Sequence, residues 1–194
     1  VLGACEAGIV VTTINNHHVE GEIAQQLIDS DAKLLFGSVS SQKVLKKAVE
    51  LTKRSIEIIC VSQSEEELPS DGINFTELLE KFEDFPLDHE RNCYKTALLL
   101  YSSGTTGISK GVMLSHMNVV SSSLMFNHPA VAFTLPAIGN HQDVIQCVAP
   151  FFHVYGLSAG LITKLAQGCK IVTLSKFHPD TYLKALEKHQ ASVI

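Results

Sequence analysis

The sequence has little positive charge and no long apolar run. Its 194 residues contain 15 Lys and Arg against 20 Asp and Glu, a formal net charge of −5. The longest charged run, Glu65 to Glu67, is acidic, whereas a protein that binds nucleic acid needs a clustered basic face. No apolar run approaches the ~20 residues that cross a bilayer as a helix. These absences argue against nucleic acid as a partner and against a transmembrane segment.

The sequence has no C-x-x-C pair, and no signal peptide can be read in it. The five cysteines are widely spaced and none forms a C-x-x-C pair, which disfavours zinc and thioredoxin-type chemistry. Most lie in apolar stretches, where free cysteine behaves as a small hydrophobe, and this fits a reducing, intracellular compartment. No charged-then-apolar leader is present. Both ends, Val1 to Cys5 and Ala191 to Ile194, resemble the interior of an element, so we expect a fragment of a larger protein.

The composition is typical of a globular protein, and two kinds of apolar pattern alternate along the chain. Hydrophobic residues make up 45% and charged residues 18%. Short β-branched runs alternate with longer amphipathic ones, which predicts an α/β fold with largely parallel sheets covered by helices. A polar stretch over 62–74 and a charged connector over 83–95, on either side of a short helix, indicate two possible sub-parts, 1–61 and 96–194. The expected strands are 8–13, 33–37, 56–61, 96–101, 111–115, 144–149 and 169–174, and the expected helices are 21–30, 44–51, 75–82, 119–126, 155–166 and 179–189.

One loop concentrates phosphate-binding chemistry. Directly after the apolar run 96–101, the string SSGTTGISKG (102–111) holds hydroxyls, glycines and a single lysine. Glycine allows consecutive backbone N–H groups to converge on an anion, and the hydroxyls and Lys110 add further donors. The alternative is an ordinary flexible surface loop, since clusters of Ser, Thr and Gly are usually that. Composition alone leaves these two interpretations open.

The common phosphate motifs do not describe this loop. A Walker A loop requires G-x-x-x-x-G-K-[ST], and neither Gly104 nor Gly107 is followed by that pattern. Lys110 precedes Gly111 and leads into an apolar strand instead of opening a helix. The glycine fingerprint of dinucleotide-binding folds is absent too. The loop is therefore predicted to be a phosphate cradle of a different architecture.

The string YSSGTTGISKGVMLSH (101–116) resembles the signature loop of the AMP-forming, adenylate-producing superfamily. That superfamily includes acyl-CoA synthetases, 4-coumarate:CoA ligases, firefly-type luciferases and the adenylation domains of peptide synthetases. One departure is Ser109, where the family usually has Pro, and the change loosens the loop without removing a donor. The resemblance implies that the β- and γ-phosphates of ATP are held by Ser102, Ser103, Gly104, Thr105, Thr106 and Lys110.

A second string, APFFHVYGL (149–157), resembles the acid-pocket segment of the same family. By itself, a His in an aromatic run is more often a packed residue than a catalytic one. The resemblance implies that His153 contacts the carboxylate that attacks ATP, and that Tyr155 and Gly156 line the acid pocket. Lys176 lies where 4-coumarate:CoA ligases place a lysine that contacts CoA, and a solvated lysine after a strand is the plain alternative.

The resemblance extends over the whole chain and implies a two-step reaction. A carboxylic acid and Mg²⁺-bound ATP give acyl-AMP, and CoA then takes the acyl group. The adjacent His17 and His18 are not expected to bind metal, because neighbouring side chains point apart and no third ligand is in view. The resemblance implies that the C-terminal domain and its catalytic lysine are absent from these residues, so we expect the fragment alone to be inactive, and the parent to be cytoplasmic or peroxisomal. A luciferase-like monooxygenase and a non-catalytic, truncated nucleotide-binding protein are the alternatives.

Overall fold

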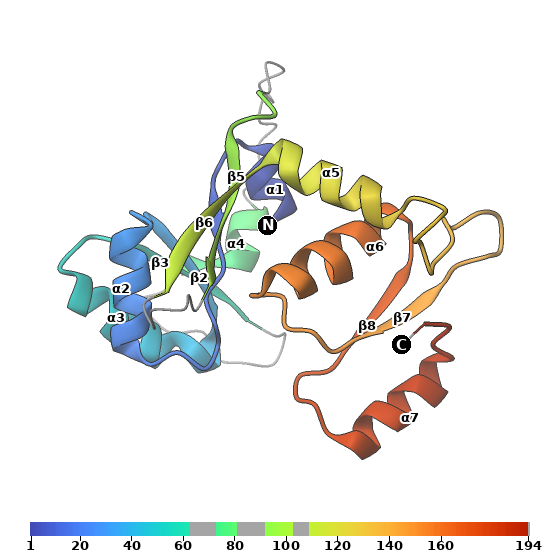
Figure 1. Cartoon of the computed structure of the whole chain (residues 1–194). Coiled ribbons are helices and arrows are strands. Elements are labelled where there is room, and N and C mark those ends of the chain that lie inside the picture. Colours follow the sequence, from blue (N-terminus) through green and yellow to red (C-terminus); the bar gives the residue numbers. More distant parts are fainter. Residues whose placement is uncertain (63–72, 81–91, 103–108, 194) are drawn as a thin grey trace. The chain divides into compact units, whose positions relative to one another are not determined.

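The computed structural model describes residues 1–62, 73–80, 92–102 and 109–193 (Figure 1). The chain divides into two compact units. One is Ile14–Glu90, and the other combines Val1–Thr13 with Arg91–Ile194. Within the described residues, no helix is both long enough and apolar enough to cross a membrane.

The unit Ile14–Glu90 is a parallel sheet with helices. Its three strands lie in the order β2-β3-β4, and every neighbouring pair is parallel. A core of apolar side chains from α2, α3 and β2 includes Leu27 and Ala48, which are almost fully buried. The elements are α2 (Glu20–Asp29), β2 (Leu34–Ser38), η1 (Val39–Ser41), α3 (Gln42–Thr52), β3 (Glu57–Val61), β4 (Ile73–Asn74) and α4 (Phe75–Glu80).

Local signals in this unit explain where α2 begins and why α3 lies close to β2. The Glu22 carboxylate accepts a hydrogen bond from the Val19 backbone N–H at 2.9 Å, which satisfies a donor at the first turn of α2. A side chain at Gly37 would collide with the Leu45 side chain and approach Ser41 Oγ at 2.9 Å. Glycine at this position therefore lets α3 pack directly on the strand.

The second unit contains a mixed sheet in the order β1-β5-β6. Strand β1 pairs parallel with β5, with Val11 opposite Leu98, and β5 pairs antiparallel with β6. A separate parallel pair is formed by β7 and β8. The elements are α1 (Leu2–Glu6), β1 (Val11–Thr12), β5 (Thr96–Ser102), β6 (Lys110–Ser115), α5 (His116–Phe126), β7 (Val144–Cys147), η2 (Tyr155–Ile162), α6 (Thr163–Ala166), β8 (Lys170–Thr173) and α7 (Pro179–His189).

The predicted fold class, α/β with largely parallel strand pairs, is confirmed, and so is the position of most elements. The unit boundaries differ from the predicted sub-parts 1–61 and 96–194. The first thirteen residues join the second unit, because β1 pairs with β5 and not with β2. The predicted strand 8–13 is also shorter, since only Val11–Thr12 pairs.

The apolar helix predicted over 155–166 is a π-helix followed by one α-helical turn. Two glycines on this segment contact the chain closely: a side chain at Gly156 would meet the backbone of Ala149 and Pro150, and one at Gly160 would approach Cys147 Sγ at 2.9 Å. The backbone of η2 therefore lies directly against the preceding turn and β7. π-Helical turns are uncommon and occur frequently at functional sites.

The core of the second unit joins β5 to η2. Leu98 and Leu157 are each 1% exposed and belong to one cluster with Ala97 and Leu100. We expect Leu98→Ala to lower the free energy of unfolding by about 2–5 kcal/mol, through lost burial and the cavity left behind. The control is Leu183→Ala, because Leu183 is 61% exposed on α7. Urea unfolding of both variants measures the difference, and equal losses would contradict the assigned core.

Candidate functional site

The predicted phosphate loop connects two paired strands. Ser102 ends β5 and lies opposite Lys110, the first residue of β6, across an antiparallel register. Both side chains are exposed. Among the residues that the structure describes, none forms an ion pair or a hydrogen bond with the Lys110 ammonium group. The predicted ligands Ser103, Gly104, Thr105 and Thr106 lie outside the described residues.

Tyr101 and Gly111 form the pair next to the loop. A side chain at Gly111 would come within 3.2 Å of the Tyr101 ring. The ring therefore occupies the space above the glycine, and the two strands stay close at the base of the loop. This contact places Ser102 and Lys110 at a well-defined end of the hairpin.

His153 lies in a tight turn immediately before η2. Its backbone N–H donates to the Pro150 carbonyl at 3.1 Å, and its carbonyl accepts from the Leu157 N–H at 2.9 Å. The imidazole is exposed, and its Nδ1 accepts a hydrogen bond from the Tyr155 backbone N–H at 3.3 Å. When Nδ1 is an acceptor, the neutral ring has its proton on Nε2, so Nε2 is a donor.

The two other predicted pocket residues have different environments. Tyr155 is 63% exposed, so its ring is available to a ligand. Gly156 is buried, and a side chain there would come within 2.8 Å of the Ala149 carbonyl oxygen and closer still to that of Pro150. Gly156 therefore shapes the turn that presents His153 and Tyr155.

One core and one hydrogen bond connect the two motifs within the second unit. Leu157 of η2 packs with Leu98 and Leu100 of β5, the strand that ends at Ser102. Thr13 Oγ1, directly after β1, donates to the Phe152 carbonyl at 2.7 Å. Since β1 and β5 run parallel, their carboxyl ends lie at the same edge of the sheet, and the His153 turn is tied to that edge.

Lys176 is exposed beyond the end of β8. No hydrogen bond or ion pair among the described residues joins it to the other candidate residues. The role of Lys176 as a CoA contact therefore stays a prediction.

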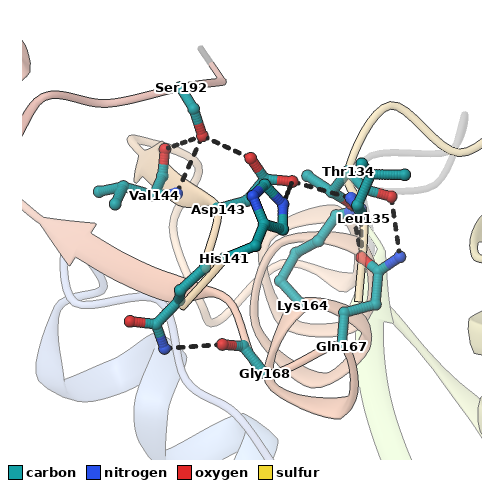
Figure 2. Close-up of polar contacts among 10 residues, drawn as sticks. Thr134, Leu135, His141, Asp143, Val144, Lys164, Gln167, Gly168 and Ser192 are labelled. Atoms are coloured by element: carbon teal, nitrogen blue, oxygen red, sulfur yellow. Dashed lines mark hydrogen bonds and ion pairs between the residues drawn. The ribbon is translucent and has the colours of Figure 1, made fainter. Parts of the chain in front are cut away.

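A buried polar network was missed by the sequence reasoning (Figure 2). Lys164, 4% exposed, donates to Thr134 Oγ1 at 2.7 Å and to Gln167 Oε1 at 3.1 Å. Its ammonium group also lies 4.4 Å from the centre of the Phe133 ring, a cation–π arrangement. The sequence signal that could have indicated this network is the single charged residue, Lys164, in the largely apolar run 161–166. The network ties α6 to the segment around Thr134.

Burial changes the proton affinity of this lysine. Loss of water lowers the pKa of Lys164 below the ordinary lysine range, against smaller opposing effects of Cys169 and Asp143. A lowered pKa means that the folded state binds the proton less tightly than the unfolded chain does. Stability therefore rises with pH between the folded pKa and the ordinary value of about 10.4.

Asp143 anchors the other side of the same region. Its carboxylate accepts from the Leu135 backbone N–H at 2.8 Å and from Ser192 Oγ at 2.8 Å. These bonds, the Leu135 N–H first, hold the pKa of Asp143 below its usual range, and His141 adds a smaller effect. The carboxylate thereby joins the start of β7 to the segment around Leu135 and to the segment around Ser192 (Figure 2).

A family model described as AMP-binding enzyme matches residues 1–194, and the chain therefore belongs to that family. Among its relatives, 4-coumarate–CoA ligase 1 of Petroselinum crispum is 33% identical over 194 residues, which cover 99% of this chain and 34% of the relative. The peroxisomal OPC-8:0-CoA ligase 1 of Arabidopsis thaliana is 32% identical over 195 residues, with 98% and 33% covered. The chain thus spans about a third of the length of these relatives.

Solved structures agree with this assignment. A red-emitting luciferase from Phrixothrix hirtus superposes with a TM-score of 0.81 at 26% identity, over 98% of this chain and 36% of the luciferase. ATP-bound MatB from Rhodopseudomonas palustris superposes with a TM-score of 0.74 at 25% identity, over 96% of this chain and 34% of MatB. The α/β arrangement is therefore that of adenylate-forming enzymes, in their N-terminal part.

The buried lysine network generates a stability prediction. We expect Lys164→Ala to lower the free energy of unfolding by about 2–4 kcal/mol, because it leaves a cavity and removes hydrogen bonds to Thr134 and Gln167. The matched control is Lys184→Ala on α7, where the side chain is exposed, and a surface change of this kind stays within about 0.5 kcal/mol. Thermal unfolding of both variants provides the comparison. Indistinguishable melting temperatures would show that the network does not stabilise the fold.

Proposed function

We propose that the enzyme containing this chain activates a carboxylic acid with ATP and transfers the acyl group to CoA. The observation that supports this most is the shared core of β5 and η2, which links the strand ending at Ser102 to the turn that exposes His153. The relatives named 4-coumarate–CoA ligase and OPC-8:0-CoA ligase point to the same reaction class. The acid is of the 4-coumarate or fatty-acid type.

Ser102 and Lys110 are proposed to begin and end the ATP-phosphate cradle, with Ser103, Gly104, Thr105 and Thr106 between them. Both described residues are exposed at the hairpin end, and the ammonium group of Lys110 can neutralise phosphate charge. ATP arrives with Mg²⁺, which neutralises further charge on the phosphates. The related MatB has been solved with ATP bound, which supports ATP as a substrate of this fold.

His153 is proposed to hold the substrate carboxylate in line with the α-phosphate. The carboxylate oxygen forms a bond to phosphorus while the bond to the β-phosphate oxygen breaks, and pyrophosphate leaves. Positioning and charge stabilisation supply the acceleration in such reactions. Nε2 of His153 donates to the carboxylate, and Tyr155 and Gly156 line the acid pocket. In the second step the CoA sulfur attacks the acyl carbonyl and AMP leaves, with Lys176 contacting CoA.

Two other functions are the alternatives to an acid:CoA ligase. A luciferase-like monooxygenase would use the same adenylate, and a luciferase is among the similar structures. A non-catalytic nucleotide-binding protein would retain only the cradle. Acid-dependent exchange between ATP and pyrophosphate separates both enzymes from the binding protein, and thioester formation without light separates the ligase from the luciferase.

The chain is proposed to act as part of a larger N-terminal AMP-binding domain. It spans about a third of the length of its relatives, so residues 1–194 alone are expected to be inactive. A cytoplasmic or peroxisomal site is proposed, and one relative is named as peroxisomal. The effects of substitutions on activity are therefore expected in the complete enzyme.

Lys110→Ala is expected to raise the KM for ATP or lower kcat by about 10-fold or more, because a charge that neutralises phosphate is lost. The melting temperature should stay nearly unchanged, since the side chain is exposed. Lys188→Ala, an exposed lysine on α7, is the control. Normal ATP kinetics with a large drop in melting temperature would instead support the ordinary-loop interpretation.

His153→Ala is expected to slow acyl-AMP formation by about 10²-fold, the effect of losing a positioning or electrostatic group. Thioester formation from supplied acyl-AMP should change much less, because that step does not need the carboxylate aligned on ATP. Single-turnover measurement of each half-reaction tests this, with His17→Ala in the exposed turn before α2 as the control. Equal losses in both steps would assign His153 a structural role.

A further inference from the structure

We propose that Thr13 is a positioning residue for His153, an inference that rests on the proposed role of His153 in adenylation. Thr13 follows β1 and is distant in sequence from the His153 turn. Its hydroxyl nevertheless donates to the Phe152 carbonyl oxygen at 2.7 Å. That oxygen belongs to the peptide group that joins Phe152 to His153.

The same peptide group is held from its other side. The His153 N–H donates to the Pro150 carbonyl at 3.1 Å. With the C=O bonded to Thr13 and the N–H bonded to Pro150, the plane of this peptide group cannot rotate without breaking a hydrogen bond. These two bonds hold the peptide group before His153, and the bond from the Leu157 N–H to the His153 carbonyl holds the peptide group after it. Together the three bonds restrain the backbone of His153 and hence the direction of its Cα–Cβ bond.

Thr13 is itself placed by the sheet. Val11 and Thr12 pair in parallel register with Leu98 and Leu99 of β5, and Leu98 is almost fully buried. Through Thr13, the His153 turn is hydrogen-bonded to the end of β1, which pairs with β5, the strand that ends at Ser102. A hydroxyl is needed for this contact, because the carbonyl oxygen of Phe152 can only accept a hydrogen bond.

The imidazole itself is exposed while its backbone is anchored on both sides. The Tyr155 N–H donates to Nδ1 of the ring, so the neutral imidazole carries its proton on Nε2, which can donate to a ligand. A side chain whose backbone is held on both sides and whose ring is exposed is arranged to meet a ligand. Thr13 contributes by fixing that arrangement before the substrate binds.

The test compares Thr13→Val, which removes the hydroxyl at constant shape, with Thr13→Ser, which retains it. In the complete enzyme, Thr13→Val should slow acyl-AMP formation by roughly 3- to 10-fold, the fold-change of one lost neutral hydrogen bond. Thioester formation from supplied acyl-AMP should be unaffected, and Thr13→Ser should recover most of the rate. Thr76→Val, at an exposed threonine on α4, is the matched control. Thr13→Ala replaces Thr13→Val if the valine variant fails to fold.

A double-mutant cycle separates this inference from the proposed function. If Thr13 acts through His153, Thr13→Val should have no further effect on adenylation once His153 is alanine. An equal slowing in both backgrounds overturns the positioning role, even if His153→Ala alone behaves as proposed. If His153→Ala leaves adenylation unchanged, the proposed role of His153 fails, and the Thr13 inference fails with it.

Discussion

The parallel pairing of β1 with β5 is the constraint on which the candidate site depends. It joins Val11 to Leu98 and so closes a long loop that contains the whole Ile14–Glu90 unit. Closing such a loop costs conformational entropy, although the cost grows only slowly with loop length. Burial of Leu98 with Ala97, Leu100 and Leu157 offsets it. The pairing also brings Thr13 to the strand edge beside Phe152.

Backbone contacts shape the turn that presents His153. Gly156 lets η2 approach the carbonyls of Ala149 and Pro150, and Gly160 lets it approach Cys147. The His153 backbone is bonded to Pro150 and Leu157, while its ring remains exposed. On the other side of η2, the buried Lys164 ties α6 to Thr134. A rigid frame therefore surrounds an accessible imidazole, which is the arrangement that a positioning group requires.

Elements with strong local signals were predicted closely. The predicted helix 179–189 matches α7, which has Pro179 in its first turn and Lys188 and His189 in its last. The predicted strand 56–61 matches β3 within one residue. The partner of β1 could not be predicted, because strand pairing depends on contacts distant in sequence. The π-helical geometry of η2 could not either, because an apolar run has the same composition in a π-helix as in an α-helix.

The α/β class could be predicted from the alternation of short β-branched and longer amphipathic runs, and the strings 101–116 and 149–157 carried the resemblance to adenylate-forming enzymes. That resemblance, in turn, implied the candidate residues from Ser102 to Lys110 and around His153. The pairing of β1 with β5, the bond from Thr13 to Phe152 and the burial of Lys164 with Thr134 and Gln167 became visible only in the folded chain. The difference lies in the range of the interactions. Helix caps and apolar periodicity act between near neighbours in the chain, whereas a sheet register, a buried charge and a hydrogen bond between distant segments exist only once the chain has folded.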